Sequence, residues 1–301
     1  MKIGKIIKHM RLDKPAKLRL VERDPSETHG VDMDKDEARA HLAEDVKRLA
    51  DLQERLYAQD RWAVLVVLQG MDASGKDGVI KHVMSGINPQ GCEVHSFKVP
   101  SAEELNHDYL WRTTRRLPER GHIGIFNRSY YEETLVTRVH PEVLANQKLP
   151  KRVVGDDIWQ QRFDDIRAFE RYLAHNGVLV LKFFLHISKE EQRRRFLDRL
   201  DEPAKRWKFS MSDVTERKLW DRYMAAYEDM IRATSHASAP WHVVPANNKS
   251  FAHLAVAGAM VKALDGLDLA FPKVAGKDLA KLAKVRKALL AEAKGHRKSR
   301  R

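Results

Sequence analysis

The chain has 301 residues and a mass of 34.7 kDa, and 43% of its residues are hydrophobic, so it can bury one large core or two small ones. Its single cysteine, Cys92, excludes an internal disulfide, and the sequence shows neither a signal-peptide apolar region nor an apolar run of about 18 residues. We therefore expect a soluble protein of a reducing compartment, the cytoplasm, with no membrane partner.

The net charge of +13 is concentrated at the two ends of the chain. Residues 1–20 have a net charge of +6 and residues 277–301 of +8, which leaves a net of −1 for the rest. Runs of like charge are usually solvated, and we expect solvated tails at both ends, although Leu279, Leu282, Val285 and Leu289 at helical spacing predict a helix in the last one. The predicted organisation is a basic N-terminal extension over 1–35, one domain over 36–270 and a basic C-terminal tail over 271–301.

The pattern of apolar runs predicts alternating strands and helices. Continuous or alternating apolar segments predict strands at residues 62–68, 92–99, 123–126, 178–187 and 241–244. Helices are predicted at residues 36–58, 156–176, 189–200 and 214–235, the second with Asp156 or Asp157 as its cap and Gly177 just beyond its end. Apolar strands separated by helix-length segments indicate a doubly wound α/β domain with a parallel sheet covered on both faces.

The first of these strands leads into the sequence LQGMDASGKDG, which predicts a phosphate-binding loop. Gly70, Gly75 and Lys76 match the G-x-x-x-x-G-K spacing, in which backbone N–H groups hold phosphate and the lysine reaches its terminal oxygens. The Ser or Thr that usually follows the lysine is replaced by Asp77. A second acid, Asp72, lies in the same loop, and two carboxylates beside phosphate require a cation between them. We therefore predict Mg²⁺, or Mn²⁺, at Asp72 and Asp77.

Two later strands also lead into polar segments. The strand at 123–126 is followed by Asn127, where many phosphate-loop enzymes place a metal-binding acid, and by Arg128, which a simple ion pair with Glu132 would also explain. The strand at 178–187 leads into a basic segment broken by Pro203, which predicts a lid over transferring phosphates at about 188–213. The alternative is a solvated helix with local ion pairs. The cations assigned to polyanion binding in the lid are Arg194, Arg195, Arg199, Lys205, Arg206 and Lys208.

Taken together and in order, these segments resemble the family-2 polyphosphate kinases. The matching stretches are LQGMDASGKDGVIKHVMSGINPQGCEVHSFKVPSAEELNHDYLWR, IGIFNRSYYEE, DEPAKRWKFS, WDRYMAAYEDMI and WHVVPANNK, between about residues 40 and 265. The resemblance implies a thymidylate-kinase-like P-loop kinase of the α/β class, with a five-stranded parallel sheet between helices and a basic helical lid. It also implies an enzyme that transfers the terminal phosphoryl group of inorganic polyphosphate to AMP, ADP or the guanine equivalents, reversibly, and that forms a homo-oligomer, a dimer or a tetramer.

The resemblance also implies roles for individual residues. Asp72 and Lys76 become catalytic and Arg128 a phosphate clamp, while Asn127, in an Asn-Arg-Ser-Tyr-Tyr-Glu version of its motif, resembles members that accept both nucleoside mono- and diphosphates. The predicted acceptor site comprises Asn127, Tyr131, Glu132 and Glu133. The predicted phosphate and polyphosphate site comprises Gly70, Ala73, Ser74, Gly75, Asp77, Gly78, Lys81 and Arg112 together with the lid cations.

Two other functions fit parts of the sequence. An ATP-dependent nucleoside monophosphate kinase would share the loop, the lid and the fold, and only its donor would differ. A nucleic-acid-binding protein with a secondary phosphate loop would need aromatic residues among its basic ones. Trp207 is the one such case in the lid, so no specific nucleic acid is expected as a partner.

Overall fold

The computed structural model describes residues 3–13, 15–28, 30 and 34–298. The chain divides into two units, Met1–Leu269 and Ala270–Arg301. The first unit includes residues that the sequence-based organisation assigned to an N-terminal extension. The second corresponds closely to the predicted C-terminal tail, of which residues 299–301 lie outside the described part.

The first unit is built on a six-stranded sheet in the order β1-β6-β5-β2-β4-β3. The five predicted strands are present and parallel to their neighbours, but β1 pairs antiparallel with β6, so the sheet is mixed and the prediction of a five-stranded parallel sheet was wrong in this respect. A two-residue strand is too short to produce an alternating pattern in the sequence. The strands are β1 (Arg11–Leu12), β2 (Ala63–Gln69), β3 (Cys92–Ser96), β4 (Ile123–Asn127), β5 (Val178–His186) and β6 (Trp241–Pro245).

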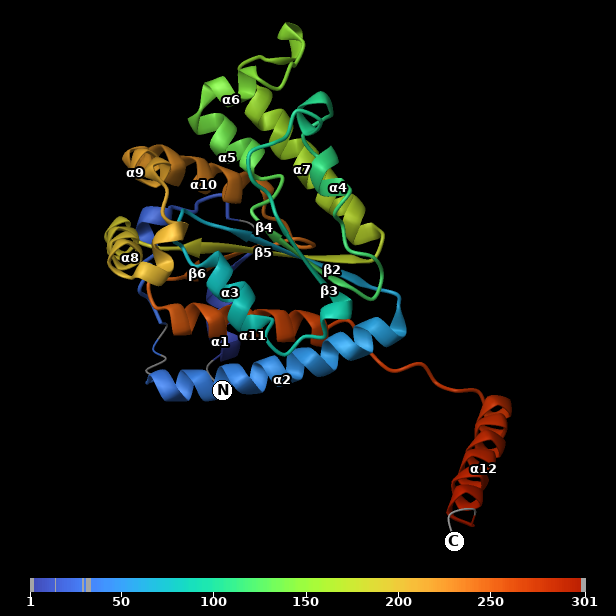
Figure 1. The fold of residues 1–301 in the computed structure, drawn as a ribbon. Helices are drawn as coiled ribbons and strands as arrows, with labels where there is room; N and C mark the ends of the chain where they lie inside the picture. The colour runs from blue at the N-terminus through green and yellow to red at the C-terminus, as the bar shows by residue number, and fades with distance from the viewer. Residues whose placement is uncertain (1–2, 14, 29, 31–33, 299–301) are drawn as a thin grey trace. The chain divides into compact units, whose positions relative to one another are not determined.

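Helices cover both faces of the sheet, as Figure 1 shows. On one face lie α5 (Glu132–Val139), α7 (Ile158–His175) and α10 (Trp220–Thr234), with α4 (Trp111–Thr114), α6 (Pro141–Ala145) and α9 (Met211–Lys218) beyond them. On the other lie α1 (Ile3–Met10), α2 (Lys35–Gln59), α3 (Lys76–Val83) and α11 (Lys249–Asp265), and α8 (Lys189–Asp201) follows the end of β5. Short 3₁₀ helices occur at Leu20–Glu22, Pro89–Gly91, Glu104–Asn106, Lys151–Val153 and Pro203–Lys208.

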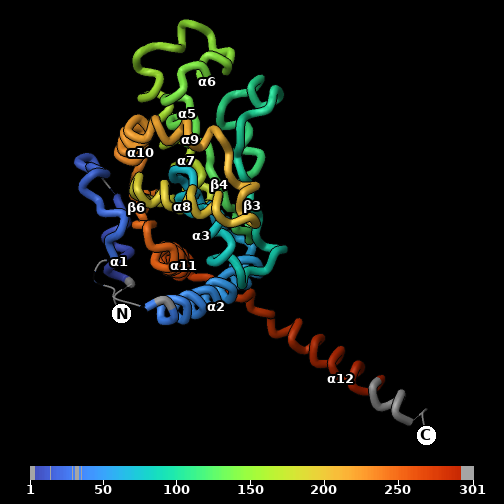
Figure 2. The backbone as a smooth tube through the Cα atoms, turned by 60° about the vertical axis from the view of Figure 1, so that its left-hand side comes forward, coloured from blue at the N-terminus to red at the C-terminus, as the bar shows by residue number. Residues whose placement is uncertain are grey.

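The helix α11 was missed in the sequence because it is apolar on all sides. Its residues from Leu254 to Val261 are all buried, and the helix packs against α2 and α3. A helix that is apolar all round has no amphipathic period and is stable only inside a core. The tube view in Figure 2 shows α11 next to α2.

The N-terminal segment belongs to the core of the first unit. Ile6, Ile7 and Met10 of α1 are buried, as are Leu18 and Leu20 beyond β1. Their burial differs from the expected solvated tail, although the neighbouring basic residues Lys5 and Lys8 are exposed. Burying an aliphatic side chain contributes about 1.5–3 kcal/mol, so this segment stabilises the unit.

Two predicted helices have different limits in the structure. The segment predicted as one helix over 214–235 forms two, α9 and α10, which are separated at Leu219. The helix α7 begins after Asp157, whose side chain forms no capping hydrogen bond, and Gly177 follows it with a φ of 76° as predicted. The second unit contains α12 (Gly276–Lys298), which confirms the predicted terminal helix.

In the described part of the chain, no helix combines the length and apolar character needed to cross a membrane.

Candidate active site at the carboxyl edge of the sheet

The loop between β2 and α3 has a backbone that requires its two glycines. Gly70 has a φ of 151°, and a Cβ atom there would lie 2.7 Å from the Ser74 hydroxyl oxygen and 2.8 Å from the Leu185 carbonyl oxygen. Gly75 has a φ of 109° and caps the N-terminus of α3. Both positions exclude a side chain, the first through space and conformation and the second through conformation. The glycine spacing found in the sequence is therefore set by the shape of this loop.

Five consecutive carbonyl groups of the loop, those of residues 70–74, accept hydrogen bonds from buried side chains. The Nζ atom of Lys76 donates to carbonyls 70 and 71, at 2.6 and 3.2 Å. The Nε2 atom of Gln192 donates to carbonyl 72 at 3.0 Å, and the Nη1 atom of Arg195 donates to carbonyls 73 and 74, at 2.9 and 2.8 Å. The N–H groups in the first turn of α3 have no intrahelical acceptor. The carbonyl oxygens of the loop are thus hydrogen-bonded inside the protein, and the N–H groups at the start of α3 remain as donors for an anion.

Lys76 is buried within this loop, with 9% of its surface exposed. Burial, and the nearby positive charge of Arg128, lower the pKa of Lys76 from 10.5 to about 8, although Asp72, Glu132 and Asp77 act in the opposite direction. A phosphate group bound beside it would favour the charged form. The lysine is therefore placed where its charge responds to the arrival of an anion.

Arg128 and Asp72 meet between the ends of neighbouring strands. Leu68 of β2 lies opposite Asn127 of β4 in the sheet register, so the segments that follow the two strands are adjacent. The Nη2 atom of Arg128 lies 2.6 Å from Oδ1 of Asp72, and its Nη1 atom lies 3.7 Å from Oε2 of Glu132. These two carboxylates raise the pKa of Arg128 above its usual range. The Arg128–Glu132 ion pair, which was the alternative explanation for this arginine, is present, and it is part of a cluster that includes Asp72 of the loop.

Asn127 contacts the second acid of the loop. Its Nδ2 atom donates to Oδ1 of Asp77 at 2.9 Å, and Nζ of Lys208 lies 3.7 Å from Oδ2 of the same carboxylate. Asn127 therefore lies beside the loop and orients one of its carboxylates, and its contact with the acceptor stays a prediction. Lys208 brings the segment after Pro203 to the phosphate loop.

The other cations of the predicted lid have local partners. Arg194 pairs with Glu191 and Asp198, Arg199 lies 3.5 Å from Asp213, and Lys205 pairs with Glu202. Arg206 donates to the carbonyl oxygen of Leu200. The side chains of Arg194 and Lys205 are about half exposed, so these pairs are weak and could be exchanged for phosphate contacts.

Arg195 has a different place from the one that the sequence predicted. It is 4% exposed, and besides the two loop carbonyls it donates to the carbonyl oxygens of Ala246 and Asn247 and pairs with Glu191 at 2.6 Å. Its donors are used inside the protein, so the prediction that it contacts polyphosphate was wrong. Arg195 supports the loop from behind.

Two residues predicted to contact the acceptor nucleotide are also buried. Tyr131 is 0% exposed and its hydroxyl donates to Glu170 at 2.7 Å, beside the buried Lys182. Glu133 is 6% exposed and forms an ion pair with Arg162 at 3.2 Å. Both predictions were wrong, because the helical turn that begins at α5 directs these neighbours of Glu132 into the core.

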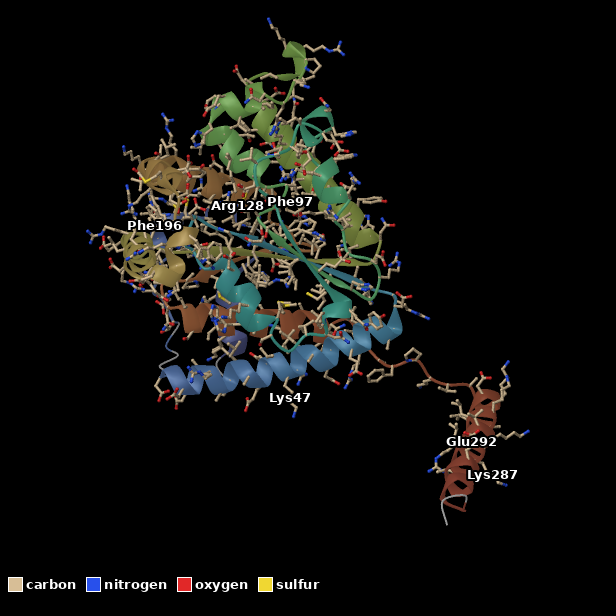
Figure 3. All side chains as sticks on the ribbon, viewed as in Figure 1. Lys47, Phe97, Arg128, Phe196, Lys287 and Glu292 are labelled. Carbon is tan, nitrogen blue, oxygen red and sulfur yellow. The ribbon has the colours of Figure 1, made fainter. Side chains whose placement is uncertain are left out.

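The two remaining predicted cations lie outside this cluster. The side chain of Arg112 is mostly buried, donates to the carbonyl oxygen of Lys98 at 2.7 Å and lies over the ring of Phe97 at 5.3 Å (Figure 3 labels Phe97 and Arg128). Lys81 is exposed on α3. A role for them in attracting a polyanion stays a prediction.

Two residues of the site were missed in the sequence. Gln192 is 1% exposed and joins loop carbonyl 72 to Arg217 of α9, whose Nη1 atom lies 3.1 Å from its Oε1 atom. Asp213 belongs to α9, and burial together with the Asp72 carboxylate raises its pKa. Gln192 and Arg195 are three residues apart and so lie on one face of α8. This spacing is the signal that could have identified Gln192 as a residue that contacts the loop.

Comparison with known proteins agrees with this arrangement. A family model described as polyphosphate kinase 2 matches residues 32–271. The ADP-polyphosphate phosphotransferase of Rhodopseudomonas palustris is 52% identical over 250 residues, which is 83% of this chain and 86% of that protein. The AMP/ADP-polyphosphate phosphotransferase of Meiothermus ruber is 47% identical over 267 residues, 89% of this chain and 96% of that protein.

A crystal structure of polyphosphate kinase 2 from Arthrobacter aurescens superimposes with a TM-score of 0.85 at 38% identity and covers 93% of this chain and 96% of that one. The α/β fold with its mixed sheet is therefore shared with a solved member of the same family. The chain belongs to the polyphosphate kinase 2 family.

Proposed function

We propose that this protein transfers the terminal phosphoryl group of inorganic polyphosphate to AMP, ADP or the guanine equivalents. The relatives from Rhodopseudomonas and Meiothermus are an ADP-polyphosphate and an AMP/ADP-polyphosphate phosphotransferase, which supports polyphosphate as donor and AMP or ADP as acceptor. The observation that carries the proposal is the cluster of Lys76, Asp72 and Arg128. Arg128 lies 2.6 Å from Asp72 of the glycine loop, and Lys76 donates to the carbonyl oxygen of Gly70 in the same loop. This is a P-loop arrangement suited to binding a transferring phosphoryl group.

In the proposed reaction one phosphoanhydride bond replaces another. An oxygen of the acceptor's terminal phosphate attacks the last phosphorus atom of the polyphosphate, and the bridging oxygen leaves with the shortened chain. The bond broken and the bond formed are of the same kind, so the reaction is reversible. The protein must mainly align the two phosphates and neutralise their charge.

The residues of the site divide this work. Lys76 and the amides at the start of α3 bind the phosphoryl group that moves, and Arg128 stabilises the negative charge of the transition state. Asp72 holds Arg128 in place before substrate binds. Lys208, which already lies near the loop, and the weakly paired Arg194, Lys205 and Arg206 bind the donor chain. Glu132 and Asn127 border the acceptor.

The donor set of the loop fits a hard divalent cation. Asp72 and Asp77 supply carboxylate oxygens, and within the described part of the chain no group of three or more His, Cys, Asp or Glu side chains could hold a metal by itself. Mg²⁺ is commonly held by one or two carboxylates with substrate phosphates completing its shell, so these two aspartates are the residues that would hold Mg²⁺ or Mn²⁺. The ion, when bound, neutralises charge on the phosphate oxygens.

The direct test uses purified protein with Mg²⁺, long-chain polyphosphate and either AMP or ADP, and the nucleotides are separated by chromatography. A matched reaction contains ATP and AMP without polyphosphate. We expect ADP and ATP to form with polyphosphate as donor, and the better acceptor to be evident from the rates. Phosphorylation with ATP as the sole effective donor would identify an ordinary nucleotide kinase instead.

Cytoplasmic location and a homo-oligomeric state, dimer or tetramer, stay predictions. Light scattering on the purified protein measures the second.

A further inference from the structure

The helix α12 separates its lysines from its apolar residues. At 100° per residue, Lys277, Lys281, Lys284 and Lys287 fall within an arc of about 120°. On the opposite side lie the apolar residues Leu279, Leu282, Val285, Leu289 and Leu290. Figure 3 labels Lys287 on this helix. We call the side formed by the four lysines the lysine face.

The lysine face is a short row of nearly unpaired charges. Its ends, Lys277 and Lys287, are ten residues apart, which corresponds to about 15 Å along the helix axis. Among the described residues, one ion pair is recorded within α12, between Lys281 and Asp278 at 3.1 Å, and it is exposed and therefore weak. Considered by itself, the helix presents a linear row of cations spaced about one turn apart.

We propose that the lysine face is a second binding site for the polyphosphate chain, additional to the phosphate loop. The inference rests on the proposed function, which makes a linear polyanion the donor. The match to the family model ends at residue 271, so α12 lies beyond the matched segment, in the second unit, whereas the phosphate loop belongs to the first. A row of lysines complements a chain that carries charge along its length. The attraction between them is electrostatic, so it requires no particular shape of the polyanion.

The composition of α12 favours polyphosphate over nucleic acid. Residues 276–298 contain no Phe, Trp or Tyr, the side chains on which bases stack in proteins that bind single strands. Lysine, which provides a point charge, predominates over arginine, which is favoured for bidentate recognition. Polyphosphate has no bases and presents charge alone. The lysine face matches that chemistry.

A second site on the same chain would act through effective concentration. Because α12 and the phosphate loop belong to one covalent chain, a polyphosphate molecule that is long enough to contact both can bind the loop while it stays bound to α12. Long chains should therefore bind more tightly than short ones, while the transfer step itself is unchanged. A short chain that occupies the phosphate loop alone should gain nothing.

The test replaces the four lysines of this face by glutamine in the full-length protein. A control variant replaces the exposed residues Arg39, Lys47, Arg171 and Lys262 of the first unit by glutamine and so loses the same net charge. A third variant replaces the four lysines of α12 by arginine and keeps the charge. Initial rates give kcat and KM for long-chain and for short-chain polyphosphate at saturating ADP. Retention of labelled polyphosphate on a gel, at several salt concentrations, gives Kd without turnover.

We expect the glutamine variant of α12 to raise KM and Kd for long chains about tenfold or more, with kcat and the short-chain KM within about twofold of the unchanged protein. The slope of log Kd against log salt should be smaller by about 3 in this variant than in the unchanged protein. This value assumes that each of the four lysines releases counterions as it would on single-stranded nucleic acid. The control variant should keep tight long-chain binding, and the arginine variant should recover most of it.

Unchanged long-chain KM and Kd, or an equal change for both chain lengths or in the control, would overturn the proposal. So would a glutamine variant that loses retention of RNA alone, or one whose oligomeric state changes while polyphosphate binding does not. If the unchanged protein transfers no phosphoryl group from polyphosphate, the proposed function fails. The gel measurement still decides whether α12 binds the chain.

Discussion

Replacing Arg195 by Met tests whether this buried cation supports the phosphate loop or contacts the substrate. The substitution removes hydrogen bonds to the carbonyl oxygens of residues 73, 74, 246 and 247 and the pair with Glu191. Hydrogen bonds from a charged donor contribute about 1.5–3 kcal/mol each, and breaking a buried charge pair costs about 3–5 kcal/mol. Glu191 keeps a second partner, Arg194 at 2.6 Å. We therefore expect the free energy of unfolding to fall by about 3 kcal/mol, the lower end of the range for a buried charge pair.

Urea unfolding monitored by circular dichroism measures the loss in free energy of unfolding, and initial rates below the transition measure catalysis. We expect kcat to fall about 100-fold as well, because loop carbonyls that lose their donors turn and misplace the amides that bind phosphate. The control is Arg194→Met on the neighbouring, exposed position, which should change stability by less than about 1 kcal/mol. An Arg195→Met protein with unchanged stability and a raised KM for polyphosphate would refute the positioning role and restore the direct contact predicted from the sequence.

Three further predictions concern the same site. Asp72→Asn should lower turnover by about 10²–10³ while the urea midpoint stays the same, and near-normal rates with Mg²⁺ would exclude Asp72 from catalysis. Since the pKa of Lys76 is lowered to about 8 and its charged form binds phosphate, kcat/KM for polyphosphate should fall as the pH rises from about 7 to about 9. Lys76→Arg should remove that fall, and a flat profile in the unchanged protein would contradict the assignment. Tyr131→Phe removes a buried hydroxyl bonded to Glu170 and should cost about 1–2 kcal/mol of stability with no change in KM for the nucleotide. A raised nucleotide KM at unchanged stability would place Tyr131 at the acceptor after all.

The chemistry of the site could be predicted where it depends on short-range sequence. The glycines of the loop are visible in the sequence because their backbone conformations exclude other residues, and Lys76 follows at a fixed distance. Arg128 and Asn127 could be placed because Asn127 is the last residue of a parallel strand and Arg128 follows it directly. The strand β1 and the helix α11 could not, since two residues give no alternation and a helix that is apolar on all sides gives no period.

Sequence by itself therefore determined which segments form the parallel strands, that a glycine loop follows β2, and which residues are candidates for binding phosphate. The tertiary structure alone decided which of these candidates are buried with their polar groups used inside the protein and which stay exposed. In the sequence, Arg194 and Arg195 are adjacent cations, and both are predicted to bind polyphosphate. Likewise, Tyr131, Glu132 and Glu133 are all predicted to contact the acceptor. Packing separates them, because a helix turns successive side chains about 100° apart and directs some to the core and others to the site. Arg195 therefore binds loop carbonyls, Tyr131 and Glu133 join buried polar networks, and Glu132 lies beside Arg128.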